Sequence, residues 1–262
     1  MTTTLLISEN LLDDARLAEG RGEKANAESL YKQALAKRKE ALGDSDASVG
    51  EYQHLLGHLY LVSGDLANAE TTLRGAVEVV EKALYAGHAR LAPILDDLAD
   101  TLLKQDRFTD AEPILTRLLD IVDKTMNGDH RYVFSSMHKL AYVHRKLGKF
   151  PEAEKLLLKA LKTIDTPLGP AEEFRFDLAL VYQEMGKNDE ADNNFKDASY
   201  GFEQRKNYPR LAESLEAYAA FLTKLGKSAQ AKRASQLATH IRETTKQNQQ
   251  SSDLFSATLL RA

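Results

Sequence analysis

The chain has 262 residues, with 35 Lys and Arg against 39 Asp and Glu, so its formal net charge is -4. This balance argues against a protein that captures nucleic acid or an anionic membrane by charge. The absence of cysteine excludes disulfides and thiolate chemistry. The N-terminal segment lacks a signal-peptide pattern, and no apolar run has the length of a membrane span. We therefore expect a soluble, cytoplasmic protein.

An Ala-Glu dipeptide recurs every 42 residues along the first part of the chain. Two further copies of the surrounding pattern follow at spacings of 38 and 40 residues. A period in this range is typical of stacked supersecondary units. The six units are centred, in chain order, on Ala27, Ala69, Ala111, Ala153, Ala191 and Ala231.

Each unit predicts a helix, a tight turn and a second helix. Apolar residues four and seven positions after the alanine lie on one helical face. A small residue stands twelve positions before the alanine, which favours close helix packing: Ala15, Gly57, Ala99, Ala141, Ala179 and Ala219. The turn falls five positions before the alanine, where glycine can adopt a left-handed conformation. These turn residues are Gly22, Gly64, Asp106 in place of glycine, Gly148, Gly186 and Gly226.

The pattern resembles the tetratricopeptide repeat. The segment "LLGHLYLVSGDLANAETTLRGA" carries that family's signature residues: Leu56, Gly57, Tyr60, Gly64, Ala69 and Ala76. The 42-residue period is similar to the long repeats of kinesin light chains. The resemblance implies an all-α fold, a right-handed α-solenoid of six helix-turn-helix repeats.

The repeats predict one solenoid over residues 1–246, without an internal boundary. Residues 247–262 begin with a polar run, which predicts a linker. An N-cap signal at Ser252-Asp253 then precedes the apolar residues Leu254, Phe255 and Leu259. This predicts a short C-terminal helix that either caps the sixth unit or docks into a groove, its own or a neighbour's.

The family resemblance also implies that the first helix of each pair lines a concave groove. Residues three, six and ten positions before the turn then face inward. On this basis the groove is acidic in its middle, then basic and aromatic, then apolar. The candidate groove residues are His54, His58, Asp96, Asp100, His138, Tyr142, Arg145 with the adjacent Lys146, Phe176 and Leu180.

Several of these residues allow a second interpretation. His54 and His58, one turn apart, could bind a metal with Asp96 or Asp100, but solvated histidines are favoured because no further ligand reinforces them. The neighbouring carboxylates could form an acid-base pair, although nothing supplies a nucleophile or a closed pocket. Phe176 and Leu180 could simply pack between repeats. We expect no metal, no cofactor and no catalytic residue.

The favoured function is a non-enzymatic adaptor that holds a peptide segment of a partner protein in the groove. The basic and aromatic residues suit a peptide with acidic residues beside a large apolar anchor. The alternative is a self-assembling structural module that uses repeat edges or exchange of the C-terminal tail. We expect neither nucleic acid nor membrane as a partner. A monomer and a weak dimer both remain open.

Overall fold

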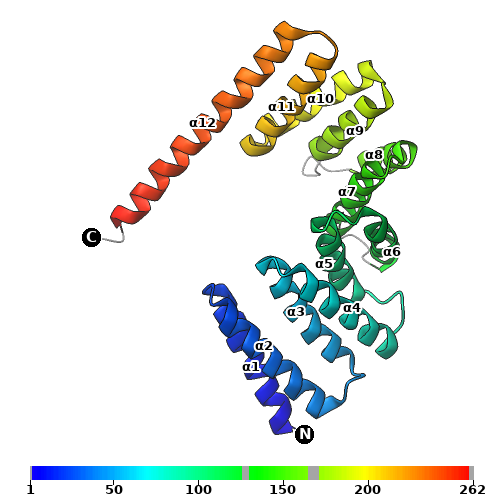
Figure 1. Ribbon diagram of the computed structural model, residues 1–262, viewed down its shortest axis with the longest axis vertical. Helices are drawn as coiled ribbons and strands as arrows, with labels where there is room; N and C mark the ends of the chain where they lie inside the picture. The colour runs from blue at the N-terminus through cyan, green and yellow to red at the C-terminus, as the bar shows by residue number, and fades with distance from the viewer. Residues whose placement is uncertain (1, 126–129, 165–170, 260–262) are drawn as a thin grey trace. The chain divides into compact units, whose positions relative to one another are not determined.

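The computed structural model describes residues 2–125, 130–164 and 171–259. These residues form twelve α-helices and no strand (Figure 1). The chain divides into two compact units, residues 1–147 and 148–262. The first unit holds α1 (Thr2–Gly20), α2 (Lys24–Leu42), α3 (Ala47–Ser63), α4 (Leu66–Ala83), α5 (Leu91–Lys104), α6 (Phe108–Thr125) and α7 (His130–Lys146). The second holds α8 (Phe150–Thr163), α9 (Ala171–Met185), α10 (Asn188–Gln204), α11 (Tyr208–Lys224) and α12 (Ser228–Leu259).

The predicted turns are confirmed. Gly22, Gly64, Gly148, Gly186 and Gly226 all have a positive φ, between 72° and 83°. Asp106, which replaces glycine in the third unit, takes the same region with a φ of 56°. Each of these turns therefore needs a residue with a positive φ, and in the third repeat Asp106 adopts that conformation although it has a side chain.

Close packing between the two helices of a repeat explains the small residues. Ala69 and Ala111 are fully buried. At Gly57 a Cβ atom would lie 2.7 Å from Cγ of Leu73, which is closer than real Cβ contacts. The second repeat therefore needs glycine where the others have alanine.

The acidic residue after the central alanine joins one repeat to the next. In the first five repeats it forms a hydrogen bond or an ion pair with a side chain of the following repeat. These pairs are Glu28 with Tyr60 (3.0 Å), Glu70 with Arg107 (2.5 Å), Glu112 with His144 (3.2 Å), Glu154 with Lys187 (3.0 Å) and Asp192 with Tyr218 (2.7 Å). The Ala-Glu dipeptide thus combines packing inside a repeat with a polar contact between repeats.

The last helix is longer than the others. α12 continues for 32 residues from Ser228 to Leu259, so the backbone of the predicted polar linker is helical. Whether residues 247–262 cap the sixth repeat or dock into a groove stays a prediction, and residues 260–262 lie outside the described part. Within that part, no helix is both long enough and apolar enough to cross a lipid bilayer.

Candidate functional site

The first helices α3 and α5 bring two histidines to one carboxylate. His54 and His58 lie one turn apart on α3. Nε2 of His54 is 2.8 Å, and Nδ1 of His58 is 2.9 Å, from Oδ2 of Asp97. Asp97 is thus their partner, and not Asp96 or Asp100, which the disfavoured metal-site hypothesis would have used. These hydrogen bonds make the two rings part of a polar contact between repeats. Among the described residues, no group of three or more His, Asp or Glu side chains could hold a metal ion.

The other two carboxylates of α5 face a lysine of α7. Nζ of Lys139 lies 2.7 Å from Oδ1 of Asp96 and 2.7 Å from Oδ1 of Asp100. Sequence reasoning missed Lys139. A signal for it exists, because His54 and Asp97, and likewise Asp96 and Lys139, are 43 residues apart, one more than the repeat period. The second contact of each residue, with His58 or Asp100, spans 39 residues. Asp97 and Lys139 therefore each lie between two residues that are one turn apart on the preceding first helix.

Burial and hydrogen bonding compete at this row of charges. Burial opposes ionisation of Asp97, but the hydrogen bonds from His54 and His58 outweigh it and lower its pKa to about 2. The hydrogen bond to Asp97 raises the pKa of His58. Burial raises the pKa of Asp100 despite the nearby Lys139. The three carboxylates of α5 are thus engaged by neighbouring helices.

A second cluster lies at the C-terminal end of α7. We call it the cationic cluster, and it consists of Phe108, Tyr142, Arg145 and Lys146. The rings of Phe108 and Tyr142 meet edge to face, with centroids 5.9 Å apart. Nζ of Lys146 is 5.7 Å from the Phe108 centroid and 5.5 Å from that of Tyr142, while the Arg145 guanidinium is 5.6 Å from the latter. Both cations are thus held over aromatic rings.

The cationic cluster carries charge that its surroundings leave unpaired. Within the described part of the chain, neither Arg145 nor Lys146 forms an ion pair, and Nε of Arg145 has no hydrogen-bond acceptor. Lys146 is exposed, and Arg145 and Tyr142 are half-buried. His138 lies one turn before Tyr142 and is also half-buried. Phe108 was not among the predicted residues, since it starts a second helix and the groove rule considers only first helices.

The structure places Phe176 in a core. Its side chain is only 5% exposed and meets the rings of Phe195 and Phe202 edge to face, at centroid distances of 6.2 and 6.4 Å. The Arg210 guanidinium covers the ring at 5.2 Å. Phe176 therefore offers no open surface to a ligand, and packing between helices, the alternative considered from the sequence, describes it better. Leu180, on the same helix of the second unit, is half-buried.

Comparisons with known proteins agree with this architecture. Family models described as tetratricopeptide repeat match residues 15–47, 48–121 and 90–164. The chain belongs to the tetratricopeptide repeat family. No match was found among curated proteins.

Solved structures show the same tetratricopeptide repeat fold. A putative kinesin light chain from Podosopora anserina is 22% identical, with a TM-score of 0.68, over 79% of this chain and 99% of that one. A tetratricopeptide repeat protein from Parabacteroides merdae is 19% identical, with a TM-score of 0.69, over 95% of this chain and 89% of that one. YrrB, described as having an unusual peptide-binding site, is 16% identical, with a TM-score of 0.54, over 73% and 84%. At these identities the likeness concerns the fold.

Proposed function

We propose that this tetratricopeptide repeat protein is a non-enzymatic adaptor of the cytoplasm that binds a peptide segment of a partner protein. The observation that carries this proposal is the cationic cluster, in which Arg145 and Lys146 lie over Phe108 and Tyr142 without a carboxylate partner in the described residues. A ligand that supplies the missing carboxylates would form charge-assisted hydrogen bonds there. The peptide-binding site described for YrrB is consistent with such a use of the fold.

The cluster favours a peptide with acidic residues beside a large apolar side chain. The guanidinium and ammonium groups attract the acidic residues, and the aromatic rings offer apolar contact area. An interface of this size is small, so we expect micromolar affinity for a single peptide. The cationic cluster replaces the wider groove predicted from the sequence, because Phe176 is buried and the acidic middle is already paired.

The carboxylates of α5 favour a structural role over a catalytic one. Asp97 is held by two histidines, and Asp96 and Asp100 are both held by Lys139. A general acid or base must be within reach of a substrate proton, and these carboxylates are instead bonded to histidine and lysine side chains of neighbouring helices. We therefore assign this row to the alignment of neighbouring repeats.

Titration with labelled peptides tests the proposed site. The probe is a fluorescein-labelled peptide with a central Leu-Phe pair flanked by Asp and Glu, compared with the same peptide carrying Lys in place of each acid. We expect Arg145→Glu to weaken binding of the acidic peptide by about tenfold, which corresponds to about 1.4 kcal/mol. The variant should also reduce the salt dependence of binding, because one charge-charge attraction is lost.

Lys24→Glu is the matched control, since Lys24 is an exposed cation on α2 outside the cluster. It makes the same change in net charge and should leave affinity within twofold. Equal losses in Arg145→Glu and Lys24→Glu would mean that overall charge, rather than this cluster, attracts the peptide. An unchanged affinity in Arg145→Glu would place the binding surface elsewhere.

A further inference from the structure

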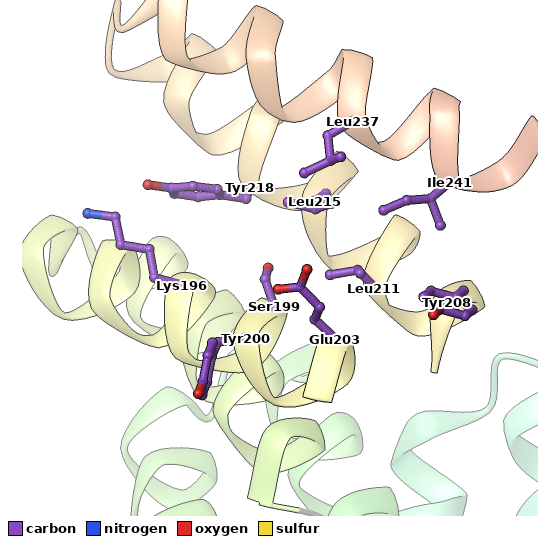
Figure 2. A pocket seen from close by; sticks show the side chains of 10 residues that line it. All are labelled: Lys196, Ser199, Tyr200, Glu203, Tyr208, Leu211, Leu215, Tyr218, Leu237 and Ile241. Carbon is purple, nitrogen blue, oxygen red and sulfur yellow. The ribbon is translucent and has the colours of Figure 1, made fainter. Parts of the chain in front are cut away.

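The second unit carries a pocket that the cationic cluster does not use. It has a volume of about 380 Å³ and opens between α10, α11 and α12 (Figure 2). Four aliphatic side chains line it, and we therefore call it the apolar pocket: Leu211 and Leu215 of α11, and Leu237 and Ile241 of α12. Ligand sites of proteins have volumes of about 300–1,000 Å³, so this hollow has room for side chains of a ligand.

Large side chains of the apolar pocket are exposed to solvent. Tyr200 of α10 is 63% exposed, Tyr208 of α11 is 43% exposed, and Leu237 is 49% exposed. Exposed aromatic and aliphatic side chains that gather around one hollow are typical of a surface that binds another molecule.

The polar groups at one end of the pocket are paired. The hydroxyl group of Tyr218 donates a hydrogen bond of 2.7 Å to Oδ1 of Asp192. Nζ of Lys196 lies 2.5 Å from Oδ2 of the same carboxylate. Because these charges already satisfy one another, a charged ligand group gains little at this end.

The pocket also contains a carboxylate without a partner. Glu203 lies in the last turn of α10, and its side chain points into the pocket (Figure 2). Within the described part of the chain its carboxylate forms neither an ion pair nor a side-chain hydrogen bond. Tyr200 lies one turn earlier on α10, and Tyr208 begins α11 five residues later. An unpaired negative charge therefore lies beside two exposed tyrosines.

We propose that the apolar pocket binds a segment of a partner protein in which a Lys or Arg stands beside large apolar side chains. The cation of this segment pairs with the carboxylate of Glu203, and the rings of Tyr200 and Tyr208 attract it further. The apolar side chains of the segment cover Leu237 and Ile241. The charge of this site is opposite to that of the cationic cluster, so the two sites select different segments.

The length of the pocket favours a peptide segment over a compact small molecule. Its lining on α11 extends from Tyr208 to Tyr218, which corresponds to about 15 Å along the helix. A segment of several residues spans this length, with its basic residue beside Glu203 and its apolar residues between the two ends. The inference concerns a second site and does not rest on the peptide site proposed above.

Titration of the full chain with the lysine-flanked Leu-Phe peptide tests the pocket, and the acidic peptide serves for comparison. We expect Glu203→Gln to weaken binding of the lysine peptide by about threefold to fivefold and to reduce its salt dependence, because a partly exposed charge pair is lost. Leu237→Gln should weaken it by about tenfold with the salt dependence retained, because apolar contact is lost.

Two variants of the same unit are matched controls. Glu190→Gln removes an exposed carboxylate of α10 that does not line the pocket. Leu158→Gln changes a 38% exposed leucine of α8. Both should keep the affinity for the lysine peptide within about twofold. Circular dichroism and thermal melting confirm that each variant is folded.

The tyrosines allow a test of the cation contact and of its place. Tyr200→Leu should weaken binding of the lysine peptide by about twofold to fivefold, whereas Tyr200→Phe, which keeps the ring, should not. The natural chain has no tryptophan, so Tyr208→Trp introduces a single one at the pocket. The unlabelled lysine peptide should change its fluorescence. Tyr85→Trp, at an exposed position between α4 and α5, should not respond.

Three outcomes overturn the proposal. Equal losses in Glu203→Gln and Glu190→Gln would assign the attraction to overall charge. Unchanged binding of the lysine peptide in Leu237→Gln would place it outside the pocket. Self-association of the wild-type chain that Leu237→Gln abolishes, measured by sedimentation equilibrium, would show that a second copy covers the pocket. Loss of acidic-peptide binding in Arg145→Glu has no bearing on these results.

Discussion

Lys206 has a positive φ of 56°, as does Asp106, although both carry side chains. This region costs an L-residue other than glycine roughly 1–2 kcal/mol, and Asp and Asn tolerate it best. Lys206 is exposed and follows α10, so its side chain offers little compensation. The turn between α10 and α11 therefore holds a strained residue, whereas most turns within repeats have glycine.

Lys206→Gly should raise the free energy of unfolding. Glycine removes the steric cost of the positive φ, but it also makes the unfolded chain more flexible by about 0.4–1 kcal/mol. The expected net gain is about 0.5–1 kcal/mol. Urea denaturation measures it, with Gly226→Ala as the opposite change at a φ of 72°. The interpretation is wrong if Lys206→Gly destabilises the chain.

The contact of His58 with Asp97 predicts a dependence of stability on pH. The pKa of His58 is raised, so its stabilising contribution is complete below the ordinary histidine pKa and is lost as pH rises through the raised value. The pKa of Asp97 is lowered to about 2, so its contribution is present above the ordinary aspartate pKa and is lost as pH falls toward that value. The pair thus contributes most between about pH 4 and pH 6.5.

His58→Gln should therefore flatten the decrease in stability between about pH 6 and pH 8. Glu19 and Asp100 also favour the protonated ring, and Lys139 remains charged throughout this range. Because the side chain of His58 is 46% exposed, solvent screening keeps the effect below about 1 kcal/mol. Urea unfolding at several pH values measures it, with His240→Gln, an exposed residue of α12, as the control. Parallel pH profiles for His58→Gln and the wild type would contradict the assignment.

At the scale of helices, the sequence predicts pairs and turns well because both depend on local chemistry. Glycine predicts the turn within a repeat, small residues predict close packing of its two helices, and the 42-residue period predicts that the repeats stack. The partner of each polar side chain is less local. Asp97 and Lys139 each contact one partner 43 and one partner 39 residues earlier in the chain, and this offset depends on how first helices lie against one another.

Phe176 illustrates why the groove could not be read completely from position. The family rule places it on the inward face of a first helix, and that rule takes no account of large neighbours. In this chain Phe195, Phe202 and the guanidinium of Arg210 surround the ring. The continuous α12 has a simpler cause. Its sequence contains neither glycine nor proline after Gly226, and polar residues such as Gln do not end a helix.

Ala153→Leu tests the packing around α8. Ala153 is fully buried on α8, so the larger side chain should force neighbouring atoms apart and destabilise the fold by about 1–3 kcal/mol. Lys155→Leu, an exposed position two residues later, should change stability by less than about 0.5 kcal/mol. Thermal and urea denaturation compare the two. Equal stability of Ala153→Leu and the wild type would show that the repeat register is wrong.

At the scale of the whole molecule, the cationic cluster and the apolar pocket belong to different units. The cationic cluster lies in residues 1–147, and the pocket of α10, α11 and α12 lies in residues 148–262. A substitution in the pocket therefore leaves the residues of the cationic cluster unchanged, and the reverse also holds.

Calorimetric titration of the acidic Leu-Phe peptide separates the two surfaces. Arg145→Glu should weaken binding by about tenfold, because the variant removes a cation of the proposed site. Leu237→Glu, a change at the pocket of the second unit, should leave the affinity within twofold, because the pocket takes no part in the peptide site. The assignment is contradicted if Leu237→Glu reduces binding of the peptide as strongly as Arg145→Glu does.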